Sequence, residues 1–294
     1  MLERRYVTFY ARSSGVRLDI AERDVVLTYV LKVLYDSSVL QSLAFKGGTC
    51  LKKIYLSRTG RFSMDLDFTA VKTAALDLQR RIKQVFDGGS YYDITFRIPE
   101  EYSRLRESYG AIVEYSHDWN KGQFKLEVSF REKPILNVSF SRIKEELYFR
   151  YCEFKPFEVP CLKMEEVLAE KIRATYQRMS ARDLYDLYLF ADKSYDRELV
   201  KRLTVLKLWE AREPFDPDTF LLHVEQEQLS FSELRDLVRA GMLPSREDIV
   251  RAILDSYSYL KSLDDELGTI IRDSRTHRRY SLIEELKNRL SQQL

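Results

Sequence analysis

The sequence predicts an α+β protein in which a mixed sheet with flanking helices is followed by a C-terminal helical domain. Three patterns indicate this class. Apolar residues recur at helical spacing over residues 18–35, and residues 63–68 alternate between small or polar and apolar side chains. Such alternation is typical of a strand with one buried face. Further alternating segments extend to residue 140, and beyond residue 160 the periodicity is helical to the end of the chain.

Length and composition indicate a soluble globular protein. The 294 residues have room for one large or two ordinary domains. A content of 45% hydrophobic and 32% charged residues excludes an intrinsically disordered chain. Because the net charge is only +2, any contact with nucleic acid must come from local patches. The sequence has no signal peptide and no long apolar run, and its three cysteines and three histidines are too scattered for a disulfide framework or a zinc site. We therefore expect a cytoplasmic protein that does not associate with a membrane.

The first elements lead to a pair of glycines. Residues 18–35 form one predicted amphipathic helix with Asp19 as a candidate cap, and residues 42–46 form a short buried strand. Gly47 and Gly48 then let the backbone approach a ligand closely. Thr49 is the predicted cap of a following helix, whose free N–H groups and positive dipole end suit a phosphate group. The alternative is an ordinary turn that binds nothing.

A pair of aspartates follows on the predicted strand of residues 63–68. Met64, Leu66 and Phe68 point to the core, so Asp65 and Asp67 project side by side from the opposite face. Two carboxylates roughly 6–7 Å apart can hold divalent cations through oxygen ligands. With a phosphate-binding turn one short loop away, they predict phosphoryl or nucleotidyl transfer, which depends mostly on charge neutralisation and positioning. A solvated sheet face is the plain alternative.

The rest of the first domain is predicted to be a helix followed by strands. Residues 76–86 form the helix, which ends at Gly88-Gly89. Asn120-Lys121-Gly122 is a predicted turn between two strands. Residues 154–160 contain two prolines and are predicted to be a linker or an extended crossing segment. The predicted strands are residues 93–97, 111–115, 124–130 and 135–140.

Beyond that segment, two predicted helices carry charged residues beside an apolar stripe. In the first, Lys171 lies on the flank of the stripe, so it is semi-buried and its amine either reaches a cleft or extends to the surface. The second begins near Arg182 and Asp183, where an acidic residue also suits the helix dipole. Residues 272–280 are the densest basic cluster. This cluster is either a solvated face or a contact for RNA or for an acidic partner.

Two blocks of sequence stand out together. They are FKGGT at residues 45–49 with RFSMDLDF at residues 61–68, and EVLAEKI at residues 166–172 with RDLYDLY at residues 182–188. Over residues 20–195 the chain resembles the AbiEii/AbiGii family of nucleotidyltransferase-fold toxins. The resemblance implies a nucleotidyltransferase-fold domain at residues 1–155 and a helical domain at residues 156–294 that contributes Lys171 and Asp183 to the cleft. One departure is Met64, because the position before the first aspartate is often acidic in that family.

The resemblance also implies an activity. It is that of a metal-dependent nucleotidyltransferase, using Mg²⁺ or Mn²⁺, that moves nucleotides from a nucleoside triphosphate to RNA such as the acceptor end of tRNA. Such a protein is the toxin of a toxin–antitoxin or phage-defence system, countered by an antitoxin protein. Asp65 and Asp67 would bind the metal, and Glu127 from a neighbouring strand would complete the set or act as general base. Lys171 would neutralise charge on the nucleotide and Asp183 would orient the lysine or the nucleotide. The candidate catalytic residues are Asp65, Asp67, Glu127, Lys171 and Asp183, and the candidate nucleotide-binding residues are Lys46, Gly47, Gly48, Thr49, Arg61, Ser63 and Arg182.

Three alternatives remain open from the sequence. The same metal site would serve a phosphotransferase that moves a terminal phosphate to protein. A catalytically silent module that binds a nucleotide or RNA would retain the same fold. Ser63 shares a predicted strand face with the aspartates, so either its phosphorylation obstructs nucleotide binding or its hydroxyl binds a phosphate of the substrate.

Overall fold

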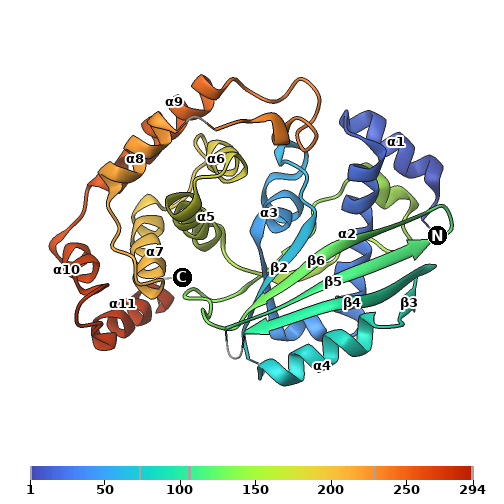
Figure 1. The fold of residues 1–294 in the computed structure, drawn as a ribbon, viewed down its shortest axis with the longest axis horizontal. Helices are drawn as coiled ribbons and strands as arrows, with labels where there is room; N and C mark the ends of the chain where they lie inside the picture. The colour runs from blue at the N-terminus through green and yellow to red at the C-terminus, as the bar shows by residue number, and fades with distance from the viewer. Residues whose placement is uncertain (1, 73, 105–106, 228, 293–294) are drawn as a thin grey trace. The chain divides into compact units, whose positions relative to one another are not determined.

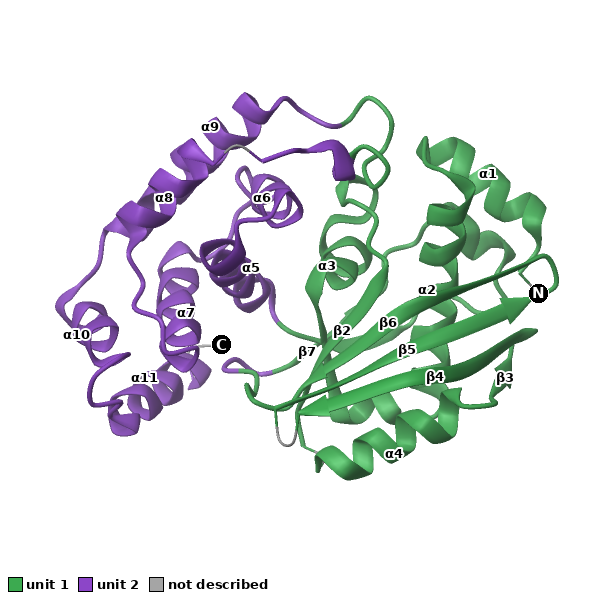
Figure 2. Ribbon diagram, viewed as in Figure 1, with its two compact units in different colours: residues 1–134, 138–162, 235–242 green, residues 135–137, 163–234, 243–294 purple. Residues whose placement is uncertain are grey.

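The chain divides into two compact units (Figure 2). The computed structural model describes residues 2–72, 74–104, 107–227 and 229–292. Unit 1 consists of Met1–Pro134, Val138–Leu162 and Arg235–Met242, and unit 2 consists of Ile135–Asn137, Lys163–Leu234 and Leu243–Leu294. Unit 1 contains the sheet and unit 2 is helical, so the predicted α+β class, a mixed sheet with flanking helices followed by further helices, is confirmed.

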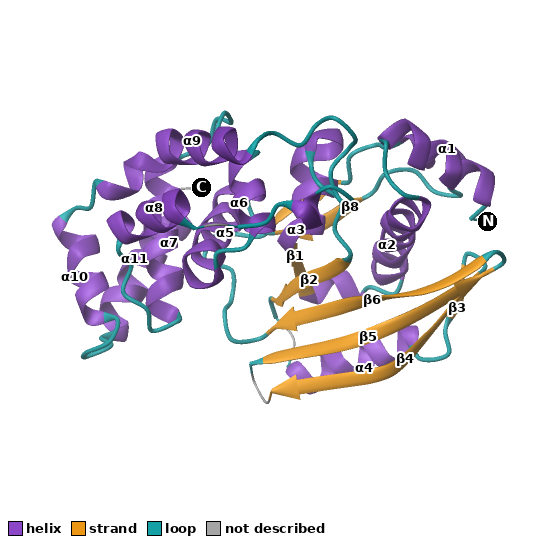
Figure 3. Ribbon diagram, turned by 45° about the horizontal axis from the view of Figure 1, so that its top comes forward, coloured by secondary structure: helices purple, strands orange, loops and turns teal. Residues whose placement is uncertain are grey.

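A mixed sheet of eight strands, counted over the described residues, is the framework of unit 1 (Figure 3). The strand order is β3-β4-β5-β6-β2-β1-β8-β7. β2 runs parallel to β6 and β1 runs parallel to β8, whereas the other neighbouring strands are antiparallel. The strands are β1 (Leu43–Lys46), β2 (Asp65–Ala70), β3 (Ser90–Tyr91), β4 (Ile94–Arg104), β5 (Ser108–His117), β6 (Asn120–Ser129), β7 (Ser139–Arg142) and β8 (Glu158–Cys161).

Helices α2 and α4 pack against one face of this sheet (Figure 1). Leu66 and Phe68 of β2 are buried on that face in one core cluster with Val30 of α2 and Ile82 of α4. Because alternate residues of a strand point to opposite faces, the polar residues of β2 project from the other side. The helical segments of unit 1 are α1 (Arg4–Ser14), α2 (Leu18–Asp36), α3 (Gly47–Cys50) and α4 (Ala75–Phe86), with short 3₁₀ turns η1 (Val39–Ser42), η3 (Ser57–Thr59) and η4 (Leu147–Tyr151).

The helix after the glycines begins earlier than the predicted cap. α3 starts at Gly47, directly after the extended Lys46, and its helical path continues as a π-helix, η2 (Leu51–Leu56). Thr49 therefore lies inside the helix, and its buried hydroxyl donates to the Asp65 carbonyl oxygen at 2.5 Å. Asp19 lies in the first turn of α2 and its side chain does not cap that helix. Both cap predictions are wrong because the backbone leaves the extended region before these residues.

The turn between β5 and β6 is also different from the prediction. His117 pairs with Asn120, so Asp118 and Trp119 form the turn and Asn120-Lys121-Gly122 belongs to β6. In contrast, the predicted strands at residues 93–97, 111–115 and 124–130 correspond to β4, β5 and β6. The local alternation therefore found these strands but did not determine where they turn.

The strand predicted at residues 135–140 is wrong in its first part, and the segment predicted as extended at residues 154–160 contains a strand that was not predicted. The backbone N–H groups of Ile135 and Leu136 donate to the Glu166 carboxylate at 2.9 and 3.0 Å, within unit 2, so this segment does not pair in the sheet. The strand predicted at residues 135–140 therefore begins only at Ser139, as β7. The extended segment at residues 154–160 contains β8, which pairs with both β1 and β7.

Unit 2 is built from helices that begin at ordinary capping residues. The side chains of Ser180, Asp196 and Ser245, for example, each accept an N–H group of the first turn. None of the helices in the described residues combines the length and apolar character that crossing a bilayer requires. The helical segments are α5 (Met164–Arg178), α6 (Ala181–Tyr188), α7 (Arg197–Glu210), α8 (Pro217–Gln226), η5 (Ser232–Leu234), α9 (Arg246–Tyr257), η6 (Ser258–Lys261), α10 (Asp265–Asp273) and α11 (Tyr280–Gln292).

Candidate active site

The two aspartates of β2 project from the sheet face opposite α2 and α4. Asp65 and Asp67 are half-buried, whereas the intervening Leu66 is fully buried. β2 lies between β1 and β6, so Asp67 has a register partner on each side, Lys46 and Glu127. Register partners on adjacent strands point to the same face. Lys46, Asp67 and Glu127 therefore form a row across the sheet.

The glycine turn lies directly against this row. Gly47 has a φ of +74°, a left-handed conformation that favours glycine. A Cβ atom at Gly47 would overlap the Asp67 carboxylate. Side chains larger than hydrogen are therefore excluded at Gly47 by both backbone conformation and space, and the turn and the carboxylate are in contact.

Arg61 and Ser63 converge on the second glycine. A Cβ atom at Gly48 would lie 2.9 Å from the Arg61 guanidinium and 3.1 Å from the Ser63 hydroxyl. Arg61 is buried and donates to the Phe62 carbonyl oxygen at 3.3 Å. Ser63 precedes β2, which begins at Asp65 rather than at residue 63. A guanidinium and a hydroxyl are groups that bind phosphate oxygens.

Glu127 is held by two neighbours on the same sheet face. Its Oε1 accepts a hydrogen bond from the Tyr102 hydroxyl at 3.0 Å and lies 2.9 Å from the Lys125 ammonium. Tyr102 belongs to β4 and reaches across Gly110 of β5, where a Cβ atom would overlap the tyrosine ring. Burial lowers the pKa of Lys125, but its bonds to Tyr102 and Glu127 outweigh burial and raise that pKa overall. The charge on Glu127 is thus compensated within the sheet face.

The two aspartates fit a magnesium or manganese ion that is shared with a substrate. Within the described residues, no three or more acidic, histidine or cysteine side chains gather into a metal-binding group. Mg²⁺ that accompanies a phosphate substrate commonly takes one or two carboxylates, and waters and phosphate oxygens complete its shell. Asp65 and Asp67 supply that number of carboxylates on one strand face. Glu127, bound to Lys125 and Tyr102, is the register partner of Asp67 on the neighbouring strand.

In unit 2, Lys171 is held between two aspartates of α6. Its ammonium lies 3.1 Å from Asp183 and 2.7 Å from Asp186, and the residue is only 9% exposed. Arg178 and Ser180 each bind the Asp183 carboxylate at 2.7 Å. Burial raises the pKa of Asp183, but Lys171, Arg178 and Ser180 outweigh burial and hold that pKa well below its usual range. Lys171 and Asp183 are therefore together as a buried ion pair, and Asp186 is an equal partner in it.

Arg182 and the basic cluster have different environments in unit 2. Arg182 is exposed in the first turn of α6. Within residues 272–280, the Arg278 guanidinium lies over the Trp209 ring at 4.0 Å, and Arg279 forms an ion pair with a buried aspartate of α10 at 3.0 Å. These two arginines stabilise their own surroundings, so only part of the basic cluster is available for a partner.

A family model matches most of the chain, residues 29–265. The description of that family is nucleotidyl transferase AbiEii toxin of a type IV toxin–antitoxin system. The chain belongs to this family. It is therefore a nucleotidyltransferase and the toxin of a type IV toxin–antitoxin system, as the resemblance of the two sequence blocks implied. Membership of the family implies a nucleoside triphosphate substrate and an antitoxin partner.

Solved structures show which proteins have a similar fold. The chain is similar to MenT4, a nucleotidyltransferase toxin from Mycobacterium tuberculosis H37Rv, with a TM-score of 0.85 and 24% identity over 99% of each chain. It is also similar to JHP933 from Helicobacter pylori, with a TM-score of 0.47 and 19% identity over 93% of this chain and 99% of that one. The likeness to MenT4 shows that the two chains share a fold. No curated protein sequence matches the chain.

Two residues beside the candidate site of this AbiEii-family chain, Tyr102 and Gly110, were not predicted from the sequence, and Asp186 was interpreted as structural rather than as part of the site. Tyr102 and Gly110 support Glu127 from two other strands, and that arrangement depends on strand register, which no local pattern shows. Asp186 binds Lys171 from the same helix as Asp183. Its position three residues after Asp183 places both carboxylates on one helix face, so the spacing alone was a usable signal.

Proposed function

We propose that this AbiEii-family enzyme uses Mg²⁺ or Mn²⁺ to transfer nucleotides from a nucleoside triphosphate to RNA, with tRNA as the first candidate substrate. The observation that carries the proposal is the contact of Gly47 with Asp67 inside the row of Lys46, Asp67 and Glu127. The backbone of Gly47, which can approach a phosphate group closely, lies against the Asp67 carboxylate, which can bind a divalent cation. Nucleotidyl transfer depends on that combination because positioning and charge neutralisation supply most of its catalysis.

Each residue near the glycine turn has a proposed role. Asp65 and Asp67 hold the metal ion, which when bound neutralises charge on the phosphates of the triphosphate. The backbone of Gly47 and Gly48 binds the triphosphate oxygens, as do the side chains of Lys46, Arg61 and Ser63. Thr49 acts through its bond to the Asp65 carbonyl oxygen, which fixes the turn relative to β2. Glu127 takes the proton of the attacking hydroxyl or orients that hydroxyl.

The roles of the unit 2 residues rest on the family pattern. Lys171 would neutralise charge on the nucleotide, and Asp183 would orient the lysine through their 3.1 Å ion pair or orient the nucleotide. Arg182 would bind a phosphate oxygen. These roles remain predictions.

The test uses the purified protein with total cellular RNA and each nucleoside triphosphate in turn, labelled on either the α or the γ phosphate. The proposal predicts α label in RNA, no transfer of γ label, loss of labelling when EDTA is added and recovery with Mg²⁺ or Mn²⁺. Sequencing of the labelled RNA would identify the substrate. Transfer of γ label to protein would show a phosphotransferase instead, and α label in RNA that persists in EDTA would contradict metal dependence.

A further inference from the structure

A short segment from the C-terminal half of the chain is embedded in unit 1. Residues Arg235–Met242 belong to unit 1, although the chain before and after them belongs to unit 2. We call these residues the returning segment. Val238 is buried, and Leu237 packs against the core cluster of unit 1. A Cβ atom at Gly15 of unit 1 would lie 2.9 Å from Ala240, so the segment lies tightly against the end of α1.

The returning segment binds the loop that leads to β2 at two points. The Phe62 N–H donates to the Leu237 carbonyl oxygen at 2.7 Å. Arg239 donates from Nε to the Arg58 carbonyl oxygen at 2.8 Å. These bonds enclose residues 58–62, and Arg61 and Ser63 are the immediate neighbours of Phe62. The loop that brings Arg61 and Ser63 to Gly48 is therefore held by a segment from a distant part of the sequence.

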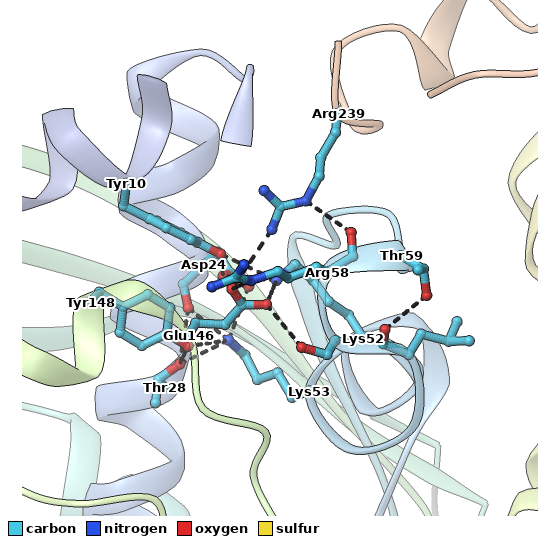
Figure 4. Close-up of polar contacts among 12 residues, drawn as sticks. Tyr10, Asp24, Thr28, Lys52, Lys53, Arg58, Thr59, Glu146, Tyr148 and Arg239 are labelled. Carbon is cyan, nitrogen blue, oxygen red and sulfur yellow. Dashed lines mark hydrogen bonds and ion pairs between the residues drawn. The ribbon is translucent and has the colours of Figure 1, made fainter. Parts of the chain in front are cut away.

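Arg239 is also connected to a network of buried charges (Figure 4). Its Nη2 lies 3.7 Å from the Glu146 carboxylate and makes no hydrogen bond among the described residues. Glu146 is buried and lies 3.6 Å from the Lys52 ammonium. Lys52 and its neighbour Lys53 both form ion pairs with the buried Asp24. Arg239 thus contributes a positive charge that faces a buried carboxylate in a region of low dielectric constant.

The same network holds the helix that follows the glycines. Lys52 and Lys53 lie on η2, which continues the helical path that begins at Gly47. Asp24 therefore anchors the glycine turn through the two lysines, whereas Glu146 and Arg239 anchor the loop of residues 58–62. Both sides of the candidate phosphate site depend on this network.

We propose that Arg239 is a positioning residue for the nucleotide site, because it holds the loop that aligns Arg61 and Ser63 with Gly48. This inference rests on the proposed function of that site. Arg239 contacts neither Gly48 nor the aspartates in the described interactions, so its effect passes through the loop. Misplacement of a phosphate-binding group weakens nucleotide binding more than it alters the chemical step that the carboxylates support.

The experiment compares the apparent KM for the nucleoside triphosphate and kcat in the full-length wild-type protein, Arg239→Lys and Arg239→Ala. Arg239→Lys keeps a positive charge near Glu146 but removes the Nε–H group that donates to the Arg58 carbonyl oxygen. It is the variant to use if Arg239→Ala does not fold. We expect KM to rise about threefold in Arg239→Lys and about tenfold in Arg239→Ala, with kcat changed less than about twofold. Thermal melting checks that each variant is folded.

Two comparisons separate positioning from a structural role. Arg17→Ala is the matched control, because Arg17 contacts Asp236 of the same segment through an exposed ion pair at 3.7 Å and should leave KM unchanged. In an Arg61→Met background, Arg239→Lys should increase KM less than it does in the wild-type background, because part of its effect passes through Arg61. The inference is overturned if Arg239→Lys leaves KM unchanged, or if its increase in KM is the same with and without Arg61. A wild-type protein that transfers no nucleotide would instead refute the proposed function.

Discussion

At the scale of single residues, the candidate site depends on a glycine that no other residue can replace. Gly47 combines a left-handed backbone with the absence of space for a Cβ atom beside Asp67. The sequence analysis identified this glycine through its position before a short helix, and also identified the aspartate through strand alternation. Their direct contact could not be predicted, because it depends on how β1 and β2 pair.

Replacement of Gly47 by alanine should therefore impair activity more than stability. We expect Gly47→Ala to lower nucleotide incorporation at least about a hundredfold, because the new methyl group displaces the Asp67 carboxylate. Gly88→Ala is the matched control, because Gly88 also has a positive φ, +87°, but has no atom within 4 Å of the position of a Cβ. Both variants should lose about 1–2 kcal/mol of stability from backbone strain. Equal incorporation by the two variants would contradict the assigned contact.

Asp183 gives a prediction that can be measured without any substrate. Its folded-state pKa is held well below the usual value, so its stabilising contribution is present at neutral pH and is lost as the pH falls below about 4. Asp183→Asn should reduce the free energy of unfolding by roughly 3 kcal/mol at pH 7, and this difference from wild type should shrink as the pH is lowered. Urea unfolding at several pH values measures it. The exposed Asp192 is the control, and a constant difference for Asp183→Asn across pH would refute the ion-pair assignment.

At the scale of secondary-structure elements, the sheet brings together residues that are distant in sequence. Tyr102 of β4 reaches Glu127 of β6 only because Gly110 of β5 leaves room between them. The alternating patterns predicted β4, β5 and β6 as separate strands. Their order in the sheet depends on long-range pairing, which the hydrophobic pattern of one strand does not specify.

The Tyr102 contact should matter for activity only through Glu127. We expect Tyr102→Phe to reduce kcat about three- to tenfold, and to have no further effect in a Glu127→Gln background. Tyr109→Phe is the matched control, because Tyr109 lies on β5 and its hydroxyl bonds Glu101 at 3.3 Å on the helix-covered face. If Tyr102→Phe has the same effect with and without Glu127, the tyrosine acts in another way.

At the scale of the whole molecule, the sequence predicted a sheet with flanking helices followed by further helices. It did not predict that the returning segment belongs to unit 1. The helical stripe of α5 and the start of α6 were predicted correctly, because their apolar spacing is local. The returning segment could not be predicted, since its bonds to the loop at Phe62 involve backbone groups that leave no trace in residue type. Ile135 and Leu136 are a second case, because their sequence alternates as in a strand. Their backbone N–H groups bind the Glu166 carboxylate and not a neighbouring strand.

The basic cluster gives a prediction about RNA. Arg272 and Arg275 are the exposed arginines of residues 272–280 that form no ion pair among the described contacts. If the cluster binds the RNA substrate, Arg272→Gln with Arg275→Gln should weaken RNA binding and lower the slope of log affinity against log salt by about 1.5–2. The KM for the nucleoside triphosphate should not change. Arg251→Gln, an exposed arginine of α9, is the control, and an unchanged salt slope in the double variant would exclude this RNA contact.

We propose that Asp65 and Asp67 of β2, in contact with the turn that begins at Gly47, carry out nucleotidyl transfer. The most direct measurement is incorporation of an α-labelled nucleoside triphosphate into RNA by wild-type protein and by Asp67→Asn, which keeps the size of the side chain but removes its charge. We predict a loss of about a thousandfold or more at saturating Mg²⁺, with an unchanged melting temperature. Incorporation at the wild-type rate by Asp67→Asn would contradict the claim.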